Sequence, residues 1–197
     1  MKFDKSIVQT RFQSPLGPMI LAATDKGLAG LWFEGQRHLP PELAPTLVTA
    51  CTALPPEGAV LARGGPSRRT AVWPSDPEHP VLKQTIQQLT DYFAGQRTRF
   101  DVPLDLTYGT AFQQSVWQAL LAIAQGDTAS YSEVSNRIGK PAAVRAVGAA
   151  VGRNPVSIIV PCHRVLGADG ALTGYAGGLD RKTALLKLEG ALQEHLL

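Results

Sequence analysis

The feature that most constrains the fold is a nearly continuous apolar run at residues 156–160, which ends at Pro161 and leads into Cys162 and His163. A short run rich in β-branched residues predicts a buried strand. Proline lacks the N–H group that a central strand donates, so the chain must leave the sheet at Pro161. We therefore expect Cys162 and His163 to lie where a buried strand emerges, a common place for a reactive side chain.

Cys162 has two interpretations. A lone cysteine is most often a small buried apolar side chain. The neighbouring His163 and Arg164 favour a reactive thiol, because positive charge lowers the pKa of a thiol and the thiolate is the nucleophile. Adjacent strand residues point to opposite faces, so contact between Cys162 and His163 requires irregular backbone after Pro161 or a bridging water.

The N-terminal third predicts an antiparallel meander of three strands. Strand-like runs occupy residues 7–12, 19–24 and 28–33. They are separated by the turn sequences Ser14-Pro15-Leu16-Gly17 and Asp25-Lys26-Gly27. Turn residues between apolar runs are typical of hairpins, so neighbouring strands should pair in chain order.

The next segment, residues 35–80, is rich in Pro, Gly and Ala and shows little periodicity. It predicts a long exposed loop. Its basic run at residues 63–69 could contact phosphate, but a solvated loop is the preferred interpretation. Cys51 also lies in this segment, and we expect no role for it.

A helix and a connector mark the middle of the chain. The predicted helix at residues 82–93 has one apolar face, formed by Leu82, Ile86, Leu89 and Phe93. Residues 100–106 predict an extended connector or an edge strand. We place the domain boundary there, between an N-terminal domain of residues 1–105 and a C-terminal domain of residues 106–197.

The C-terminal half predicts several short helices, two of which begin with a capping box. The boxes are formed by Thr110 with Gln113 and by Ser130 with Glu133. Pro141 suits the first position of the next helix, which we expect to end at Gly152. Two short helices joined by a turn at Gly139 resemble a helix-turn-helix.

The second helix of this pair is rich in alanine and glycine, and Arg145 is its one long side chain. Small side chains permit tight packing against the protein core. They equally permit close approach to a groove of DNA. Composition alone does not decide between these two interpretations.

Two features near the C-terminus each carry a functional interpretation. The glycines of residues 174–178 allow backbone N–H groups to approach a ligand closely. Glu189 lies in the last turn of the final predicted helix, where a carboxylate opposes the helix dipole. It is either a solvated surface residue or the third member of a Cys–His–Glu set, held there to orient a histidine.

Composition sets outer limits on function. The chain has 197 residues, a net charge of +3, four histidines and two cysteines. The mild positive charge permits nucleic-acid binding without establishing it. We expect a cytoplasmic protein without a disulfide framework or a metal site, because zinc-ligand spacing, an apolar stretch of about 20 residues and a signal peptide are all missing from the sequence.

The motifs together resemble those of the O6-alkylguanine-DNA alkyltransferases, also called methylated-DNA–protein-cysteine methyltransferases. Pro161-Cys162-His163-Arg164-Val165, preceded by Asn154-Pro155, is similar to the active-site signature of that family. The resemblance is close over residues 109–190 and includes Tyr131, residues 145–148 and residues 174–178. Residues 14–38 resemble the bacterial form, which has a full N-terminal domain.

The resemblance implies an α+β fold. It combines an N-terminal three-stranded antiparallel sheet with a helix, ribonuclease-H-like, and a mostly helical C-terminal domain with a helix-turn-helix. It implies direct-reversal DNA repair, in which a monomer binds the minor groove of double-stranded DNA and flips out the O6-alkylguanine nucleotide. The alkyl group moves once, to Cys162, without a cofactor. Activity on O4-alkylthymine is left open.

The resemblance also implies roles for individual residues. Cys162 would accept the alkyl group, His163 would deprotonate it through a water, Glu189 would orient His163, and Asn154 would brace the active-site turn. On the DNA side, Tyr131 would contact the flipped base and the adjacent backbone, and Arg145 would fill the gap in the base stack. The backbone around Cys162 and Val165 would accept hydrogen bonds from the base, and Tyr175 and the Ala176 N–H would bind the guanine oxygen.

The chain departs from the family pattern at two places. Ala176 stands where some relatives have serine, so a side-chain contribution there is absent. Residues 35–80 are longer and richer in proline than in the family. Some relatives carry a structural zinc in the N-terminal domain, and this sequence offers no ligand set for one.

Three other functions fit the sequence less well. A DNA-binding relative without chemistry would replace the reactive cysteine, whereas this chain has Cys162. A helix-turn-helix transcription regulator usually carries several polar base-reading side chains, whereas the helix here offers essentially Arg145. A cysteine hydrolase generally brings its nucleophile and base from distant positions, whereas Cys162 and His163 are adjacent.

Overall fold

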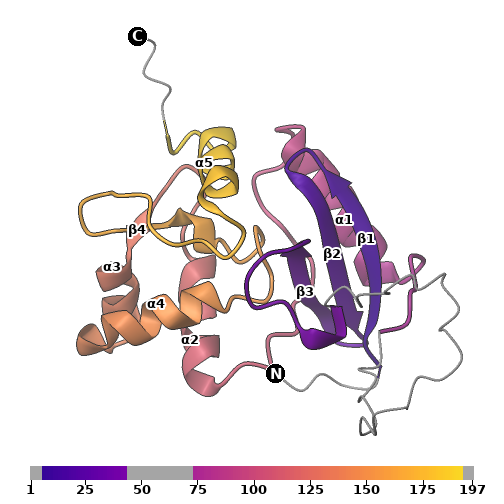
Figure 1. Ribbon diagram of the computed structural model, residues 1–197, viewed down its shortest axis with the longest axis horizontal. Helices are drawn as coiled ribbons and strands as arrows, with labels where there is room; N and C mark the ends of the chain where they lie inside the picture. Colours follow the sequence, from indigo (N-terminus) through magenta and orange to yellow (C-terminus); the bar gives the residue numbers. More distant parts are fainter. Residues whose placement is uncertain (1–5, 44–72, 193–197) are drawn as a thin grey trace, which may run out of the picture.

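The three predicted strands form an antiparallel sheet in chain order (Figure 1). They are β1 (Val8–Ser14), β2 (Gly17–Thr24) and β3 (Gly27–Phe33). In this computed structural model, which describes residues 6–43 and 73–192, Gly17 and Gly27 follow the two turns with φ of 110° and 152°. Such φ values favour glycine. The predicted meander is confirmed.

The two faces of the sheet pack against different parts of the chain, as the alternation of strand side chains requires. Met19, Leu21 and Leu31 lie in the main core, which also contains residues of helix α1 (Pro80–Phe93) and of the C-terminal helices. On the opposite face, Trp32 belongs to a smaller cluster with Trp73, whose ring centroid lies 6.1 Å away. The basic run at residues 63–69 and Cys51 lie outside the described residues.

The connector after α1 touches the free edge of β3. A single parallel bridge joins Leu28 to Leu104, with the Leu28 N–H donating to the Pro103 carbonyl at 2.8 Å. Thr24 Oγ1 also donates to Asp105 Oδ2 at 2.8 Å. Residues 100–106 are therefore a connector that one bridge and one side-chain hydrogen bond anchor to the sheet, not a full edge strand.

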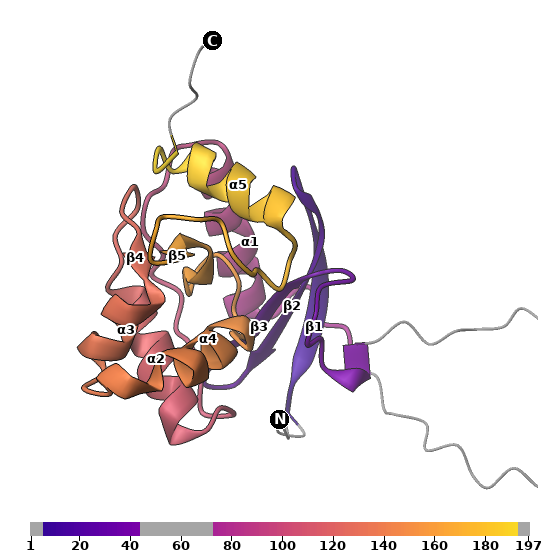
Figure 2. The ribbon, with the colours of Figure 1, turned by 60° about the vertical axis from the view of Figure 1, so that its left-hand side comes forward.

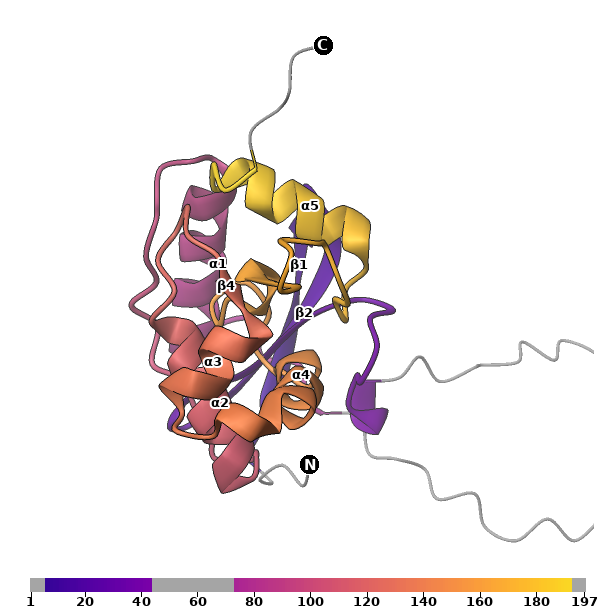
Figure 3. The ribbon, with the colours of Figure 1, turned by 90° about the vertical axis from the view of Figure 1, so that its left-hand side faces the viewer.

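The C-terminal half is mostly helical, which confirms the α+β fold class. Its helices are α2 (Ala111–Leu121), α3 (Tyr131–Arg137), α4 (Val144–Gly152) and α5 (Leu179–Leu188). Helices α2, α3 and α4 contact one another and form one group, seen together in Figure 3. Two short strands, β4 (Ala129–Ser130) and β5 (Val165–Leu166), pair in parallel, and β4 leads directly into α3.

Both predicted capping boxes are present, at Thr110 and at Ser130. The α4 boundary differs from the prediction. Pro141 begins a 3₁₀ turn, η2 (Pro141–Ala143), and the α-helix itself starts at Val144. The proline is compatible with either conformation, because both place its missing N–H in the first turn.

Helix α5 connects the two halves of the molecule. Figure 2 shows it lying across the end of the sheet and above α1. Arg181 on α5 donates from Nε to the Leu16 carbonyl at 2.9 Å, and its guanidinium lies 4.5 Å from the centre of the Phe33 ring. Helix α5 also contacts residues 162–164, so it joins that segment to the N-terminal sheet.

The strand predicted at residues 156–160 is wrong. Only Val156 pairs with a strand, in a parallel bridge to Leu31, and the chain then turns, with Ile158 at φ 71°. The Val160 N–H donates back to the Val156 carbonyl at 3.0 Å, so the turn satisfies its own backbone groups. The run is buried as expected; its apolar character indicated burial correctly but did not determine the conformation.

No helix within residues 6–43 and 73–192 is both long and apolar enough to cross a membrane.

Candidate active site

Cys162 begins a short 3₁₀ helix, η3 (Cys162–Arg164), directly after the buried turn, and only 5% of its surface is exposed. The turn is held by Asn154. Its Nδ2 donates to the Val160 carbonyl at 2.7 Å and to Cys162 Sγ at 3.0 Å, while its Oδ1 accepts from the Val156 N–H at 3.0 Å. Because Oδ1 faces an N–H, the amide orientation is fixed and Nδ2 must point at the sulfur.

The buried position keeps the sulfur protonated at rest. Burial raises the pKa of the Cys162 thiol to about 11, against the lowering effects of the Asn154 hydrogen bond and of Lys182. The thiolate is the reactive form, so the site needs a base that removes this proton.

His163 has the geometry of such a base. It is fully buried, and its Nε2 lies 3.0 Å from Glu189 Oε1. Burial lowers the pKa of His163, although Glu189 opposes that shift. A neutral imidazole that donates from Nε2 to the carboxylate leaves a lone pair on Nδ1, and within the described residues Nδ1 has no hydrogen-bond partner. The structure thus places His163 and Glu189 in contact; their catalytic roles remain predictions.

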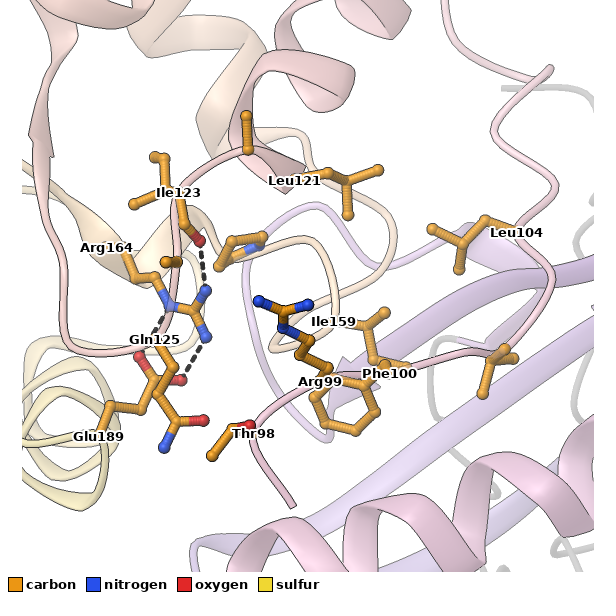
Figure 4. A pocket seen from close by; sticks show the side chains of 14 residues that line it. Thr98, Arg99, Phe100, Leu104, Leu121, Ile123, Gln125, Ile159, Arg164 and Glu189 are labelled. Carbon is orange, nitrogen blue, oxygen red and sulfur yellow. Dashed lines mark hydrogen bonds and ion pairs between the residues drawn. The ribbon is translucent and has the colours of Figure 1, made fainter.

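Glu189 is buried at the C-terminal end of α5 and is surrounded by donors. Arg164 binds it with two nitrogens, Nε to Oε2 and Nη2 to Oε1, both at 2.8 Å. Figure 4 shows this pair together with the bond from Arg164 Nη1 to the Ile123 carbonyl. These contacts and His163 lower the pKa of Glu189 to about 2, against the effect of burial. The carboxylate is therefore ionised, and it is not the solvated surface residue that was its alternative interpretation.

Two polar residues near this cluster were not predicted. Tyr92 on α1 donates its hydroxyl to Glu189 Oε1 at 2.7 Å. Lys182 on α5 is fully buried and donates from Nζ to the carbonyls of Val165 and Thr173 at 2.6 and 2.7 Å. Burial lowers the pKa of Lys182 to about 8, against the effect of Cys162. Neither residue carries a local sequence signal, because tyrosine suits an apolar helix face and lysine usually indicates a solvated one.

The residues expected to contact DNA lie outside this hydrogen-bonded cluster. Tyr131 is the first residue of α3, and a Cβ built on Gly148 would lie 3.8 Å from its ring, so the tyrosine packs over the small-sided helix α4. Arg145, near the start of α4, is exposed and forms no ion pair or side-chain hydrogen bond with any other described residue.

The residues expected to hold the base lie on the two segments after Cys162. Val165 is buried in β5, and its carbonyl accepts from Lys182. Tyr175 and Ala176 belong to the glycine-rich loop, and burial raises the pKa of the Tyr175 phenol. The Ala176 carbonyl accepts from the Arg37 N–H at 3.0 Å, which ties this loop to the segment after β3.

A cavity of about 810 Å³ lies on the side of Arg164 and Glu189, and Cys162 is not among its lining residues (Figure 4). Its other walls are formed by residues of the connector after α1, by residues 121–125 at and after the end of α2, and by Ile159 and Pro161. Within residues 6–43 and 73–192, no group of three or more His, Cys, Asp or Glu side chains is arranged to hold a metal ion.

Comparison with known families assigns both halves of the chain. Residues 7–106 match the family model described as "6-O-methylguanine DNA methyltransferase, ribonuclease-like domain". Residues 111–191 match the model described as "6-O-methylguanine DNA methyltransferase, DNA binding domain".

Individual relatives and solved structures match the same family. The chain is 43% identical over 176 residues to the methylated-DNA–protein-cysteine methyltransferase of Mycobacterium leprae, a match that covers 89% of this chain and 88% of that protein. The Methanosarcina acetivorans protein of the same name is 42% identical over 181 residues, 91% of this chain and 96% of the relative. The crystal structure of Mycobacterium tuberculosis OGT in complex with DNA is 44% identical, with a TM-score of 0.71 over 92% of this chain and 91% of that one.

Proposed function

The chain belongs to the 6-O-methylguanine DNA methyltransferase family, and from this premise we propose that it repairs alkylated DNA by transferring an alkyl group from guanine O6 to its own Cys162. The observation that carries the proposal is the buried set formed by Asn154, Cys162, His163 and Glu189. In it, a thiol follows a turn braced by an amide, and its neighbouring imidazole is bound to an ionised carboxylate.

The transfer begins with a proton. His163 Nδ1 takes the Cys162 proton through a water, and the imidazolium that forms is stabilised by Glu189 at Nε2. The Asn154 amide donates to the sulfur, and the ammonium of Lys182 adds a positive charge that favours the thiolate. These groups oppose part of the effect of burial, which favours the neutral thiol and still leaves the pKa of Cys162 raised.

The thiolate then attacks the alkyl carbon. A carbon–sulfur bond forms as the carbon–oxygen bond to guanine breaks, and the electron pair of that bond stays on the guanine. Hydrogen bonds from Tyr175 and the Ala176 N–H to guanine O6 would stabilise the developing charge. The proton that His163 took from Cys162 passes through solvent to the guanine anion, which leaves a neutral guanine and a neutral imidazole. The thioether that remains has no route back to a thiol, so each molecule acts once and needs no cofactor.

The target atom lies inside the duplex, so the nucleotide must leave the base stack, at a cost of a few kcal/mol. We assign this step to the pair α3 and α4, acting as a helix-turn-helix in the minor groove of double-stranded DNA. Arg145 would occupy the gap in the stack, and its exposed side chain, which pairs with no residue of the described ranges, suits that role. Tyr131 would contact the flipped base and the adjacent backbone. The small side chains of α4 permit the close approach that a narrow groove requires.

The proposal extends to the organisation of the protein. It includes an N-terminal domain of residues 1–105 and a C-terminal domain of residues 106–197 that carries the reactive cysteine. It also includes action as a monomer, because one chain supplies every group named above. The cytoplasm, where a thiol stays reduced, is the proposed location.

A duplex oligonucleotide with one O6-methylguanine tests the proposed function. Wild-type protein should restore guanine up to one equivalent of protein, and Cys162→Ala should restore none while still binding the duplex. Repeated turnover by the wild type, or repair by the alanine variant, would contradict transfer to Cys162.

A further inference from the structure

Tyr92 brings the N-terminal half of the chain into the proton-transfer site. It lies near the end of α1, 97 residues before Glu189, and donates its hydroxyl to Glu189 Oε1 at 2.7 Å. Its ring is 1% exposed and packs against Phe93 and Phe100, with ring centroids 5.3 Å away in both cases. The position of the hydroxyl is therefore fixed by packing within the N-terminal half.

The hydroxyl is not needed to orient the carboxylate. Arg164 already holds both oxygens of Glu189 at 2.8 Å in a two-point contact, which fixes the plane of the carboxylate. What Tyr92 adds is a third donor on Oε1, the oxygen that lies 3.0 Å from His163 Nε2. A donor on that oxygen reduces the negative charge available to His163.

The other groups around His163 come from two elements. Glu189 at the end of α5 favours the protonated imidazole, whereas Arg164 on η3 and Lys182 on α5 disfavour it. Cys162 on η3 is neutral at rest, because burial raises the pKa of its thiol. Burial and the Glu189 charge raise the pKa of Tyr92 as well, so this phenol stays protonated and acts as a donor to the carboxylate.

Building on the proposed function, we propose that Tyr92 is a positioning residue for the proton transfer. By donating to Glu189 Oε1, Tyr92 weakens the stabilisation that this carboxylate gives to the protonated imidazole of His163. His163 therefore stays neutral and able to accept the proton of Cys162. An imidazole that already carries its second proton cannot deprotonate the thiol. The N-terminal half thus contributes to the chemistry in addition to supporting the fold.

Tyr92→Phe removes the donor and keeps the ring. NMR of protein labelled at histidine, with the His163 signal assigned from its loss in His163→Gln, reports the charge of the ring directly. The His163 titration should move to higher pH by roughly half to one unit, because a hydrogen bond made directly to a charged group is worth about one to two units and Tyr92 acts on His163 only through Glu189. The acid limb of the pH profile for alkyl transfer should move in the same direction. A His163 signal and an acid limb that both stay where the wild type has them would overturn the proposal.

A second variant at the same position separates the effect of the hydrogen bond from an effect on folding. 3-Fluorotyrosine at position 92 keeps the ring and hydroxyl but donates more strongly, so the acid limb should move to lower pH than in the wild type. Tyr108→Phe, at a partly buried position packed against the smaller core cluster, is the control loss of a hydroxyl and should leave both readouts unchanged. An acid limb that moves the same way in both Tyr92 variants would overturn the proposal. The NMR measurement needs no alkyl transfer, so a failure of the proposed function would be seen separately as wild-type protein that repairs nothing.

Discussion

The side chain of Asn154 makes several hydrogen bonds to the turn at residues 156–160 and to the cysteine that follows it. Its amide binds the carbonyls of Val156 and Val160 as well as the sulfur of Cys162, and its oxygen holds the Val156 N–H. No other described side chain donates a hydrogen bond to that sulfur. The residue therefore links the shape of a buried turn to the reactivity of the thiol that follows it.

We expect Asn154→Ala to affect both properties. Buried carbonyls would lose their donor, at a cost of about 1–3 kcal/mol in the free energy of unfolding. Alkyl transfer measured with the folded variant should slow by roughly tenfold or more, since the sulfur loses a hydrogen bond that favours the thiolate. The exposed Asn136 provides a control, because its replacement by alanine should change neither quantity. A variant that transfers at the wild-type rate would remove Asn154 from the mechanism.

At the scale of elements, we expect the caps of the short helices to contribute to the free energy of unfolding. The Ser130 hydroxyl accepts from the Glu133 N–H at 3.1 Å, and the Glu133 carboxylate accepts from the Ser130 N–H. Ser130→Ala should lower the free energy of unfolding by about 1 kcal/mol, measured by urea denaturation. Ser132, exposed within the same helix, is the matched control. Equal effects of the two substitutions would show that the cap is unimportant.

Helix α4 permits a test of nucleotide flipping. Arg145→Ala should slow repair in a duplex by at least tenfold, while reaction with free O6-methylguanine base changes little, because only the duplex has a stack to open. Arg99→Ala, at an exposed position on the connector after α1, should alter neither reaction. If repair of the duplex and of the free base decline together, Arg145 acts on the chemistry and not on the stack.

The sequence predicts the elements whose conformation depends on neighbouring residues. Strands bounded by turn residues, the apolar face of α1 and both capping boxes depend on neighbouring residues, and all were found as expected. The turn at residues 156–160 was not, because its conformation depends on a bridge to Leu31, far away in the sequence. The Tyr92 and Lys182 contacts were missed for the same reason. Each joins helix residues to partners that only the tertiary fold brings near.

For the molecule as a whole, the buried charges predict a dependence of stability on pH. His163 and Glu189 both have a folded-state pKa below the ordinary values of 6.5 and 4.5. Unfolding therefore takes up protons at low pH, so the stability that these groups contribute is present above those values and declines as pH falls below them.

Urea denaturation across pH 4–8 should show stability that begins to fall below about pH 6.5, where an unfolded histidine starts to gain its proton. In His163→Gln the part of this slope above about pH 5 should be smaller than in the wild type. His79→Gln controls for a histidine at a helix terminus outside the site. Identical slopes in all three proteins would mean that His163 is not held neutral by the fold.

The central claim is that the protein itself is the alkyl acceptor, and the most direct test is its intact mass after incubation with excess duplex DNA containing O6-methylguanine, followed by peptide mapping. The account predicts a gain of one methyl group per molecule, which does not increase with further DNA, located on the peptide that contains Cys162. An unchanged mass with the DNA still bound, or a methyl group on any other peptide, would contradict it.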